Sequence, residues 1–379
     1  MKTQNEWMQI LRENKGELCV TIVVPFSMHG KPVMENPVMV RNAIKEASKM
    51  LSEHPEIELK KDEMLLKKLH GLESGIDFHQ LVQGIGMLVS NRVSRIYTFK
   101  NPVSSLINIG KNFNLRPFLQ EEANQLPCIL LMLTGNKMRL FSCIGKNMVE
   151  INEDPFPAHF KDNFEYQRPS AVSGEGSTLK GGEEKSLARQ HRLTEFFGIS
   201  VEPIKEYTKK SIPVIVAGVD EDISIIRKLL SGVSISGEIH GNYEYLPLNE
   251  LGEKVYKVLK NNRLKKISNT IDNLNEAVGN QMGSEGVEGT WHDVCEGNAR
   301  IVLIEEDKII PAYVSEDGAS IRLEADRRHT NYVHDATGEL IAMAFEKDCE
   351  IMIVRKGNLD SCGGVAVLHR FKEVFALHE

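Results

Sequence analysis

The sequence predicts an α/β protein built from two or three domains. Its 379 residues exceed the usual length of a single domain. Short β-branched or apolar runs of strand length alternate with helical patterns along the chain, which is typical of α/β folds. The apolar fraction of 41% and the charged fraction of 26% are those of ordinary globular proteins, so wholesale disorder and fibrous repeats are excluded.

Residues 1–126 are predicted to form an N-terminal α/β domain. Apolar patterns place strands over residues 18–25, 85–90 and 94–99, and helices over residues 37–51 and 64–72. Asn36 and Pro37 have the residue types of a cap and a first helical position. A connector to the next domain is expected over residues 112–127.

Residues 127–245 are predicted to form a second α/β domain. Three strands are expected between Cys128 and Ile151, joined by turns at residues 135–136 and 145–147. After a polar stretch, a helix is predicted from about Glu183 to Phe197. A buried strand and an amphipathic helix follow, over residues 211–218 and 220–230.

Residues 246–379 are predicted to form a third α/β domain. It opens with a long helical pattern from Asn249 to about Val278, which stops at Gly279. The remaining elements are two helices and four strands, predicted over residues 291–296 and 332–345, and over residues 299–304, 309–314, 351–354 and 365–371.

Composition limits where the protein works and what it binds. The longest wholly apolar run, Cys128–Leu133, is far shorter than the ~20 residues of a membrane-spanning helix. The N-terminus lacks the continuous apolar segment of a secretory signal, and the six scattered cysteines are expected to be reduced core residues. We therefore expect a soluble cytoplasmic protein with no membrane partner. Its net charge of -7 requires any nucleic-acid contact to come from a local basic face.

The most unusual segment is SGEGSTLKGGEEKSLARQHR, residues 173–192. Gly176 and Gly181 have the spacing of a phosphate-binding Walker A loop. The next two positions of that loop must be Lys and then Ser or Thr, but here they are Gly182 and Glu183. The phosphate-loop interpretation is therefore rejected.

This segment instead combines a glycine-rich arm with the N-terminus of a helix. Free backbone N–H groups at such a terminus can donate hydrogen bonds to a carbonyl or phosphate. Lys185, Arg189 and Arg192 share one helix face, with Lys180 just before them, and such a stripe suits an RNA backbone. The alternative is an ordinary solvated helix face, with Glu183 favouring the helix dipole.

Other candidate groups have stronger structural explanations. Asp220, Glu221 and Asp222 follow a strand at the edge where α/β proteins bind ligands or magnesium, but a helix cap with acids in the first turn explains them better. Trp291 is expected to pack into a core. The basic run at residues 257–266 is a second nucleic-acid face or a solvated helix surface. No metal or cofactor site is predicted.

Five segments share their pattern, in order, with one known family. They are VTIVVP, NFNLRPFL, LPCILLMLTGNKMRLFSC, SIPVIVAGVDED, and the run from Gly338 to Phe371. Together they resemble the bacterial homologues of archaeo-eukaryotic peptide-chain release factors, a group related to release factor one and Pelota. The resemblance implies a divergent N-terminal domain, a ribonuclease-H-like middle domain, and a C-terminal domain like the kink-turn-binding ribosomal proteins.

The resemblance also implies a functional site. The release factors carry a Gly-Gly-Gln loop that promotes hydrolysis of the peptidyl-tRNA ester, and Gly181, Gly182 and Glu183 occupy the equivalent place. A carboxylate with a reference pKa of about 4.3 accepts hydrogen bonds near neutral pH but does not donate them. The side-chain amide donor is therefore absent, while the backbone donors remain. No stop-codon-reading motif is present.

Two functions follow as expectations. In the first, the protein enters a stalled ribosome, contacts rRNA and the tRNA acceptor end, and promotes peptidyl-tRNA hydrolysis. In the second, it is a non-catalytic RNA- or ribosome-binding module. In both, Lys180, Lys185, Arg189 and Arg192 hold the arm against RNA, and the C-terminal domain is a candidate site for a protein partner. A third class, a hydrolase using Asp220 and Asp222, requires a pocket at that strand end.

Overall fold

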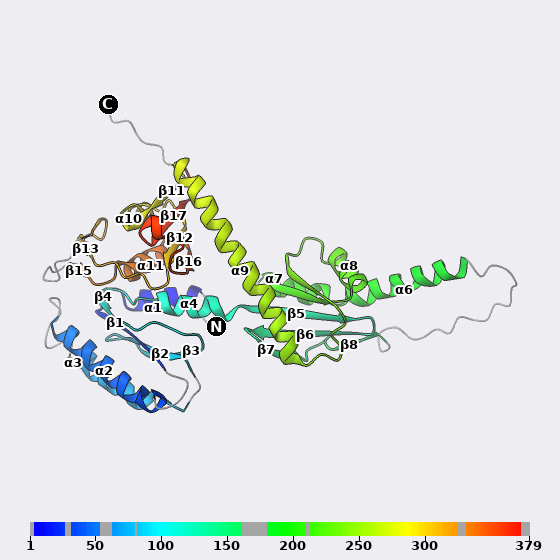
Figure 1. Cartoon of the computed structure of the whole chain (residues 1–379), viewed down its shortest axis with the longest axis horizontal. Helices are drawn as coiled ribbons and strands as arrows, with labels where there is room; N and C mark the ends of the chain where they lie inside the picture. The colour runs from blue at the N-terminus through cyan, green and yellow to red at the C-terminus, as the bar shows by residue number, and fades with distance from the viewer. Residues whose placement is uncertain are drawn as a thin grey trace. The chain divides into compact units, whose positions relative to one another are not determined.

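The computed structural model describes most of the chain and shows a mixed α/β protein with several sheets (Figure 1). The described residues are 4–26, 32–53, 63–79, 82–160, 180–209, 212–323 and 331–372. They group into two compact units: residues 1–124 with 267–379 form unit 1, and residues 125–266 form unit 2. The division into domains at residues 126 and 245 stays a prediction.

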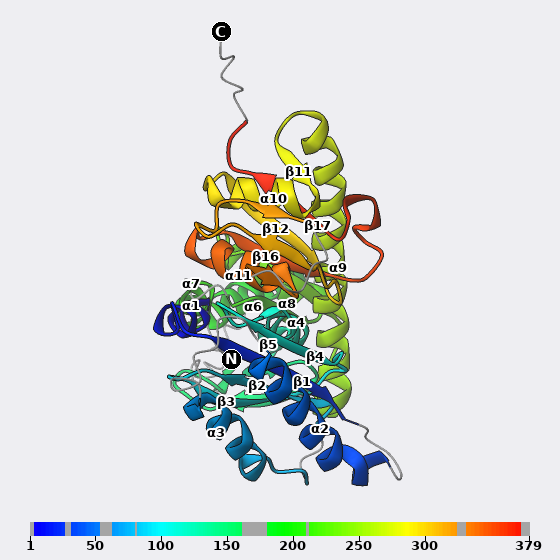
Figure 2. The same cartoon turned by 90° about the vertical axis from the view of Figure 1, so that its left-hand side faces the viewer.

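The first sheet of unit 1 is antiparallel, with strand order β3-β2-β1-β4. Its strands are β1 (Cys19–Pro25), β2 (Gly84–Val89), β3 (Ser94–Phe99) and β4 (Leu106–Gly110). Helices α2 (Pro32–Ser52) and α3 (Glu63–Gly71) cover one face, and α3 continues into a 3-10 turn, η1 (Leu72–Gly75) (Figures 1 and 2). Alternate residues of β1 face these helices, because side chains of a strand point to opposite faces.

Several predicted boundaries in this region were wrong or incomplete. Helix α2 begins at Pro32, not at Pro37, so Pro37 lies inside the helix and Asn36 is not its cap. Proline at the start of a helix is favourable because its fixed φ suits the helix and its missing N–H has no partner there. The supposed connector contains a helix, α4 (Arg116–Gln125), and the chain starts with another, α1 (Gln4–Glu13).

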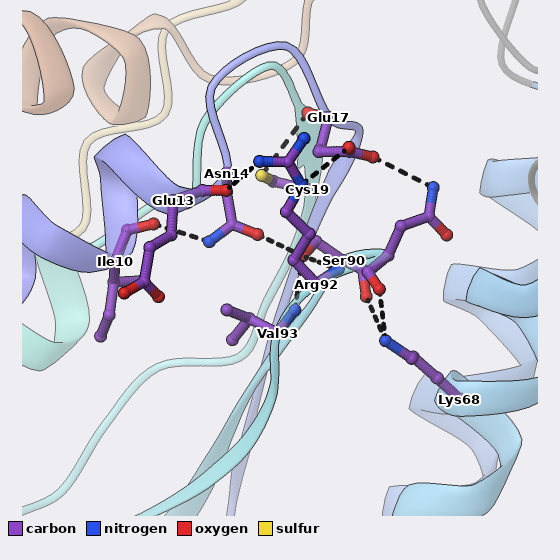
Figure 3. Close-up of polar contacts among 10 residues, drawn as sticks. Ile10, Glu13, Asn14, Glu17, Cys19, Lys68, Ser90, Arg92 and Val93 are labelled. Atoms are coloured by element: carbon purple, nitrogen blue, oxygen red, sulfur yellow. Dashed lines mark hydrogen bonds and ion pairs between the residues drawn. The ribbon is translucent and has the colours of Figure 1, made fainter.

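A polar network ties the β2–β3 turn to α1 and α3 (Figure 3). The Ser90 hydroxyl donates a short hydrogen bond to the side-chain oxygen of Asn14, and it accepts from the backbone N–H of Val93 at 2.9 Å. The Arg92 guanidinium donates to Glu17 at 3.1 Å, and the Lys68 ammonium donates to turn carbonyls. These bonds fix the hairpin that the sequence predicts at this position.

The second sheet of unit 1 has strand order β11-β17-β12-β16. Its strands are β11 (Gly283–Glu285), β12 (Ala299–Glu305), β16 (Glu350–Val354) and β17 (Val365–His369). Helices α10 (Gly286–Cys295) and α11 (Ala336–Glu346) pack against it, and a 3-10 turn, η2 (Asp360–Cys362), precedes β17. A smaller sheet has the order β14-β13-β15, with β14 (Ile321–Arg322), β13 (Ala312–Val314) and β15 (Tyr332–Val333).

The predicted helix start at Tyr332 was wrong because that residue lies in strand β15. Helix α11 begins at Ala336, since the side chain of Asp335 caps it by accepting from the backbone N–H of Thr337 at 3.1 Å. Trp291 is buried in the core, as the sequence predicts. All six cysteines are free, and only Cys295 is partly exposed.

One hydrophobic core joins the first and last parts of the chain within unit 1. Residues from α1, β1 and α4 pack in the same cluster as residues from α10, α11 and β12. At its centre, Asp335 accepts hydrogen bonds from the side chains of Asn114 at 2.7 Å and Thr337 at 2.7 Å. The Arg116 guanidinium lies 3.3 Å from the same carboxylate, and both side chains are almost fully buried.

Unit 2 contains one sheet, of order β10-β9-β5-β6-β7, with β8 paired to β6. Its strands are β5 (Pro127–Thr134), β6 (Lys137–Ile144), β7 (Asn147–Ile151), β8 (Ala158–His159), β9 (Val214–Gly218) and β10 (Ile235–His240). Strands β5, β9 and β10 are parallel, whereas β6 and β7 continue as antiparallel hairpins, as predicted.

Helices cover both faces of this sheet. Helices α6 (Lys180–Gly198), α7 (Val201–Lys209) and α8 (Asp220–Leu229) share a core on one face. The first turns of α9 (Leu248–Gly279) pack on the other face through Leu251, Val255 and Leu259. Gly252 permits this approach, because a Cβ there would collide with the Lys146 carbonyl oxygen. Among the described residues, no helix is both long and apolar enough to cross a membrane.

Replacing Arg116 by Met is predicted to destabilise unit 1 by about 3–5 kcal/mol, because it leaves the buried Asp335 carboxylate without its cation. The double variant Arg116→Met with Asp335→Asn should recover part of this loss. The measurement is the free energy of unfolding from denaturant titration. Lys15→Ala is the control, since its ion pair with Glu346 is exposed. An Arg116→Met variant as stable as this control would contradict the prediction.

Candidate functional site

The glycine pair singled out in the sequence lies in the first turn of helix α6. The helix begins at Lys180, three residues before the predicted start, so Gly181, Gly182 and Glu183 belong to the helix. The backbone N–H groups of a first helical turn have no partner within the helix. The side chains of residues 180–187, including Lys180, Glu183 and Lys185, lie outside the described part of the structure, as does the preceding glycine-rich run.

The basic residues that follow are accessible. Arg189 and Arg192 are exposed, as are their neighbours from Ala188 to His191. Burial begins with Leu193, and Phe196 and Phe197 are fully enclosed in the core of unit 2. The N-terminal part of α6 therefore extends past the sheet of its own unit (Figure 1). Among the described side chains of α6, those held by apolar packing begin at Leu193.

Arg189 of α6 lies close to the turn that follows β5 and to the first turn of α8. A Cβ built on Gly135, in the β5–β6 turn, would be 3.7 Å from a guanidinium nitrogen of Arg189. The positive charge of Arg189 also acts on the carboxyl group of Asp222 in α8, where it lowers the pKa. Three segments distant in sequence thus meet at the carboxyl ends of the parallel strands β5 and β9.

Asp222 is the most perturbed acid of this region. Its exposed fraction is 3%, and its Oδ2 atom has no hydrogen-bond partner among the described residues. Burial raises the pKa of Asp222 to about 6, with a further contribution from the neighbouring Glu221. Sequence reasoning missed this burial, although Asp222, Ile225 and Ile226 have the spacing of one apolar helix face.

Asp220 has a different role from the one predicted. Val219 is the N-cap of α8, and its side chain makes no capping hydrogen bond, so the expectation that Asp220 is the cap was wrong. Its carboxylate is instead 2.6 Å from Nδ1 of His240, at the end of β10. The acids do lie in the first turn of α8, as predicted. Asp220 is exposed, whereas Asp222 is buried.

Two further polar groups belong to elements other than α6. Asp293 and His369 form a buried pair in unit 1, at 2.8 Å. The basic run on α9 includes Lys257, Lys260 and Lys265, which are exposed. Among the described residues, no group of three or more His, Cys, Asp or Glu side chains is arranged to hold a metal ion.

The sequence and the fold of this chain are similar to those of known translation factors. Residues 128–298 match the sequence description of Bacterial archaeo-eukaryotic release factor family 3. The matched segment includes all of α6, with its glycine pair and basic residues, and the strand ends beside it. The resemblance to bacterial homologues of these release factors is thereby confirmed. A search of curated proteins finds no match.

Solved structures of translation factors are similar over much of the chain. An archaeal translation termination factor, aRF1, is 12% identical, with 98% of this chain and 99% of that chain covered and a TM-score of 0.23. The Pelota protein of Thermoplasma acidophilum is 12% identical, with coverages of 98% and 95% and a TM-score of 0.24. Dom34 of S. cerevisiae, described as a translation termination-like factor interacting with Hbs1, is 12% identical, with both coverages 76% and a TM-score of 0.41.

The raised pKa of Asp222 predicts a pH-dependent stability. The folded chain holds this proton more tightly than the unfolded chain, so the contribution of Asp222 to stability is lost as the pH rises from about 4 to about 6. Asp222→Asn should therefore be as stable as the parent near pH 4 and more stable by about 1–3 kcal/mol at pH 7. Denaturant titrations at both pH values measure this, with the exposed Glu244→Gln as control. Equal stability of Asp222→Asn and the parent at both pH values would exclude a buried, ionising Asp222.

Proposed function

We propose that the protein is a translation factor that binds the ribosome and presents the N-terminus of α6 to the acceptor end of a tRNA. The observation that carries this proposal is the exposure of Arg189 and Arg192 on α6, within the segment that matches the release-factor family. Exposed arginines spaced three residues apart suit neighbouring phosphates of an RNA backbone. The partners proposed are the ribosome, its rRNA and the tRNA, in the cytoplasm.

The reaction proposed is hydrolysis of the peptidyl-tRNA ester. Water adds to the ester carbonyl carbon, the bond to the tRNA ribose oxygen breaks, and the products are the free peptide acid and the tRNA hydroxyl. The free N–H groups around Gly181 and Gly182 would donate to the oxygen that becomes negative. The Glu183 carboxylate would accept a hydrogen bond from the attacking water, while rRNA supplies the rest of the site.

Basic residues would hold the helix in place during this step. Lys180, Lys185, Arg189 and Arg192 each add a positive charge to the first turns of α6. These charges also offset the repulsion that RNA phosphates exert on Glu183. A protein partner for residues 246–379 belongs to the same proposal.

The second candidate is a ribosome-binding module without catalysis. One observation favours it: Glu183 replaces the glutamine that the release factors carry, so the side-chain amide donor is missing. Binding through Arg189 and Arg192 does not need that donor. The two candidates therefore differ at Gly182 and Glu183 but agree on the basic residues.

Peptide release distinguishes them. Purified protein added to stalled ribosomes that carry a radiolabelled peptidyl-tRNA is expected to release the peptide. Gly182→Ala should lower the rate at least tenfold, because a methyl group at this turn obstructs close approach of the backbone to the ester. Ribosome binding of this variant should be unchanged. Absence of release by the parent protein in a complete assay would leave the binding module as the function.

Binding itself is tested by cosedimentation with ribosomes at increasing salt. Arg189→Ala with Arg192→Ala should weaken binding. The slope of the logarithm of the binding constant against the logarithm of the salt concentration should fall by up to about two, since up to two phosphate contacts are lost. Glu183→Ala should bind as well as the parent. Lys45→Ala with Lys49→Ala is the matched control, because it removes two exposed charges from one face of α2. A loss of binding as large in this control as in the arginine pair would contradict the role of α6.

A further inference from the structure

Two of the free cysteines lie opposite each other across a pair of strands in unit 2. Strands β5 and β6 form an antiparallel hairpin, and its register pairs Cys128 directly with Cys143 (Figure 1). The exposed fraction of each residue is 1%, and both belong to one hydrophobic cluster, so their side chains lie on the same face of the sheet. The strand registers that the structure describes place no other two cysteines opposite each other.

The spacing of such a pair suits a disulfide bond. The Cα atoms of directly opposite residues in an antiparallel pair lie about 4.5–5.5 Å apart. Cysteines that are joined by a disulfide have Cα separations of about 4.4–6.8 Å. Cys128 and Cys143 therefore satisfy the main geometric requirement of the bond without a rearrangement of the two strands.

A hydrogen bond between the two thiols makes them chemically different. It lowers the pKa of Cys143 despite the burial of that residue, and it raises the pKa of Cys128, where burial adds to the rise. These directions indicate that the Cys128 thiol donates to the Cys143 sulfur, which stabilises a thiolate at Cys143. A hydrogen bond from the Leu130 backbone acts on Cys143 in the same direction. Cys143 is therefore the nucleophile of the pair, because the thiolate and not the thiol attacks.

The pair lies near the open end of the hairpin rather than at the centre of the sheet. Cys128 is the second residue of β5, and Ile144, which follows Cys143, has an exposed fraction of 42%. Leu251 and Val255, in the first turns of α9, pack in the same cluster as the two cysteines. The ends of elements open locally at a lower free energy than the core, so a small oxidant can reach the sulfur atoms without global unfolding.

We propose that Cys128 and Cys143 form a redox-sensitive pair that hydrogen peroxide converts to a reversible disulfide. The Cys143 thiolate attacks a peroxide oxygen, the O–O bond breaks, hydroxide leaves, and Cys143 becomes a sulfenic acid. The Cys128 sulfur then attacks the sulfenic sulfur, the S–O bond breaks, and the departing hydroxide takes up the Cys128 proton as water. The two thiols lose two electrons and two protons, and the peroxide becomes two molecules of water.

A dithiol reverses the reaction by thiol–disulfide exchange. Because the pair packs beneath the first turns of α9, its oxidation changes the surface on which that helix rests. The modification is independent of the proposed action of α6 on the ribosome.

Peptide mapping without reduction tests the proposal. The full-length protein is reduced, freed of reductant, treated with hydrogen peroxide and quenched with catalase, and its remaining thiols are alkylated in denaturant before trypsin digestion. Trypsin cleaves after Lys137 and Arg139, between the two cysteines, so a disulfide joins two separate peptides. Mass spectrometry should find these joined peptides at least tenfold more abundant than those of any other cysteine pair. Dithiothreitol should separate them.

Single variants assign the two roles, with sulfenic acid trapped by dimedone. Cys128→Ala should lose the joined peptides and accumulate dimedone on Cys143. Cys143→Ala should carry at least tenfold less dimedone on Cys128, because burial raises the pKa of the thiol that remains. Cys295→Ala is the control, since it removes the one partly exposed cysteine and should leave the joined peptides unchanged.

The mapping of the parent protein does not depend on the folding of any variant. If Cys295 is fully oxidised in the folded parent while Cys128 and Cys143 both stay free, the proposal is overturned. Equal dimedone labelling of Cys128 and Cys143 in the two variants would overturn the assignment of Cys143 as the nucleophile.

Discussion

The structure of unit 1 depends on the buried carboxylate of Asp335. This single group caps α11, binds Asn114 and lies against the Arg116 guanidinium, so it connects a segment near residue 115 with a helix more than 200 residues later. A buried carboxylate is costly unless it is fully hydrogen-bonded and paired. Here that requirement fixes the position of α11, whose Glu339 in turn accepts from the Asn112 side-chain amide at 2.6 Å.

In unit 2, the buried carboxylate at the strand ends is less fully hydrogen-bonded than Asp335 is in unit 1. Asp222 is buried, its Oδ2 atom has no hydrogen-bond partner in the part of the chain that the structure describes, and its pKa is raised, while the charge of Arg189 acts on it from α6. The helix is therefore anchored by Phe196 and Phe197 near its C-terminus, while Arg189 and Arg192 are accessible. A helix that is apolar only in its C-terminal half can present its N-terminus without weakening the core of its unit.

Local patterns in the sequence predicted much of this arrangement. The β5–β6–β7 hairpins, the strand before α8 and the long helix α9 follow from apolar periodicity and turn residues. The start of α2 was misplaced because Pro32 and Pro37 both satisfy the same rule for a first helical position. The contacts of Asp335 with Asn114 and of Glu339 with Asn112 join residues more than 200 positions apart, which no local pattern encodes.

The central claim is that the start of α6 acts at the acceptor end of a ribosome-bound tRNA. The most direct measurement is an electron cryomicroscopy reconstruction of the protein on a stalled ribosome that carries peptidyl-tRNA. The account predicts Gly182 within contact distance of the acceptor end and Arg189 and Arg192 against RNA phosphates. Binding with α6 turned toward solvent, away from the tRNA, would contradict it.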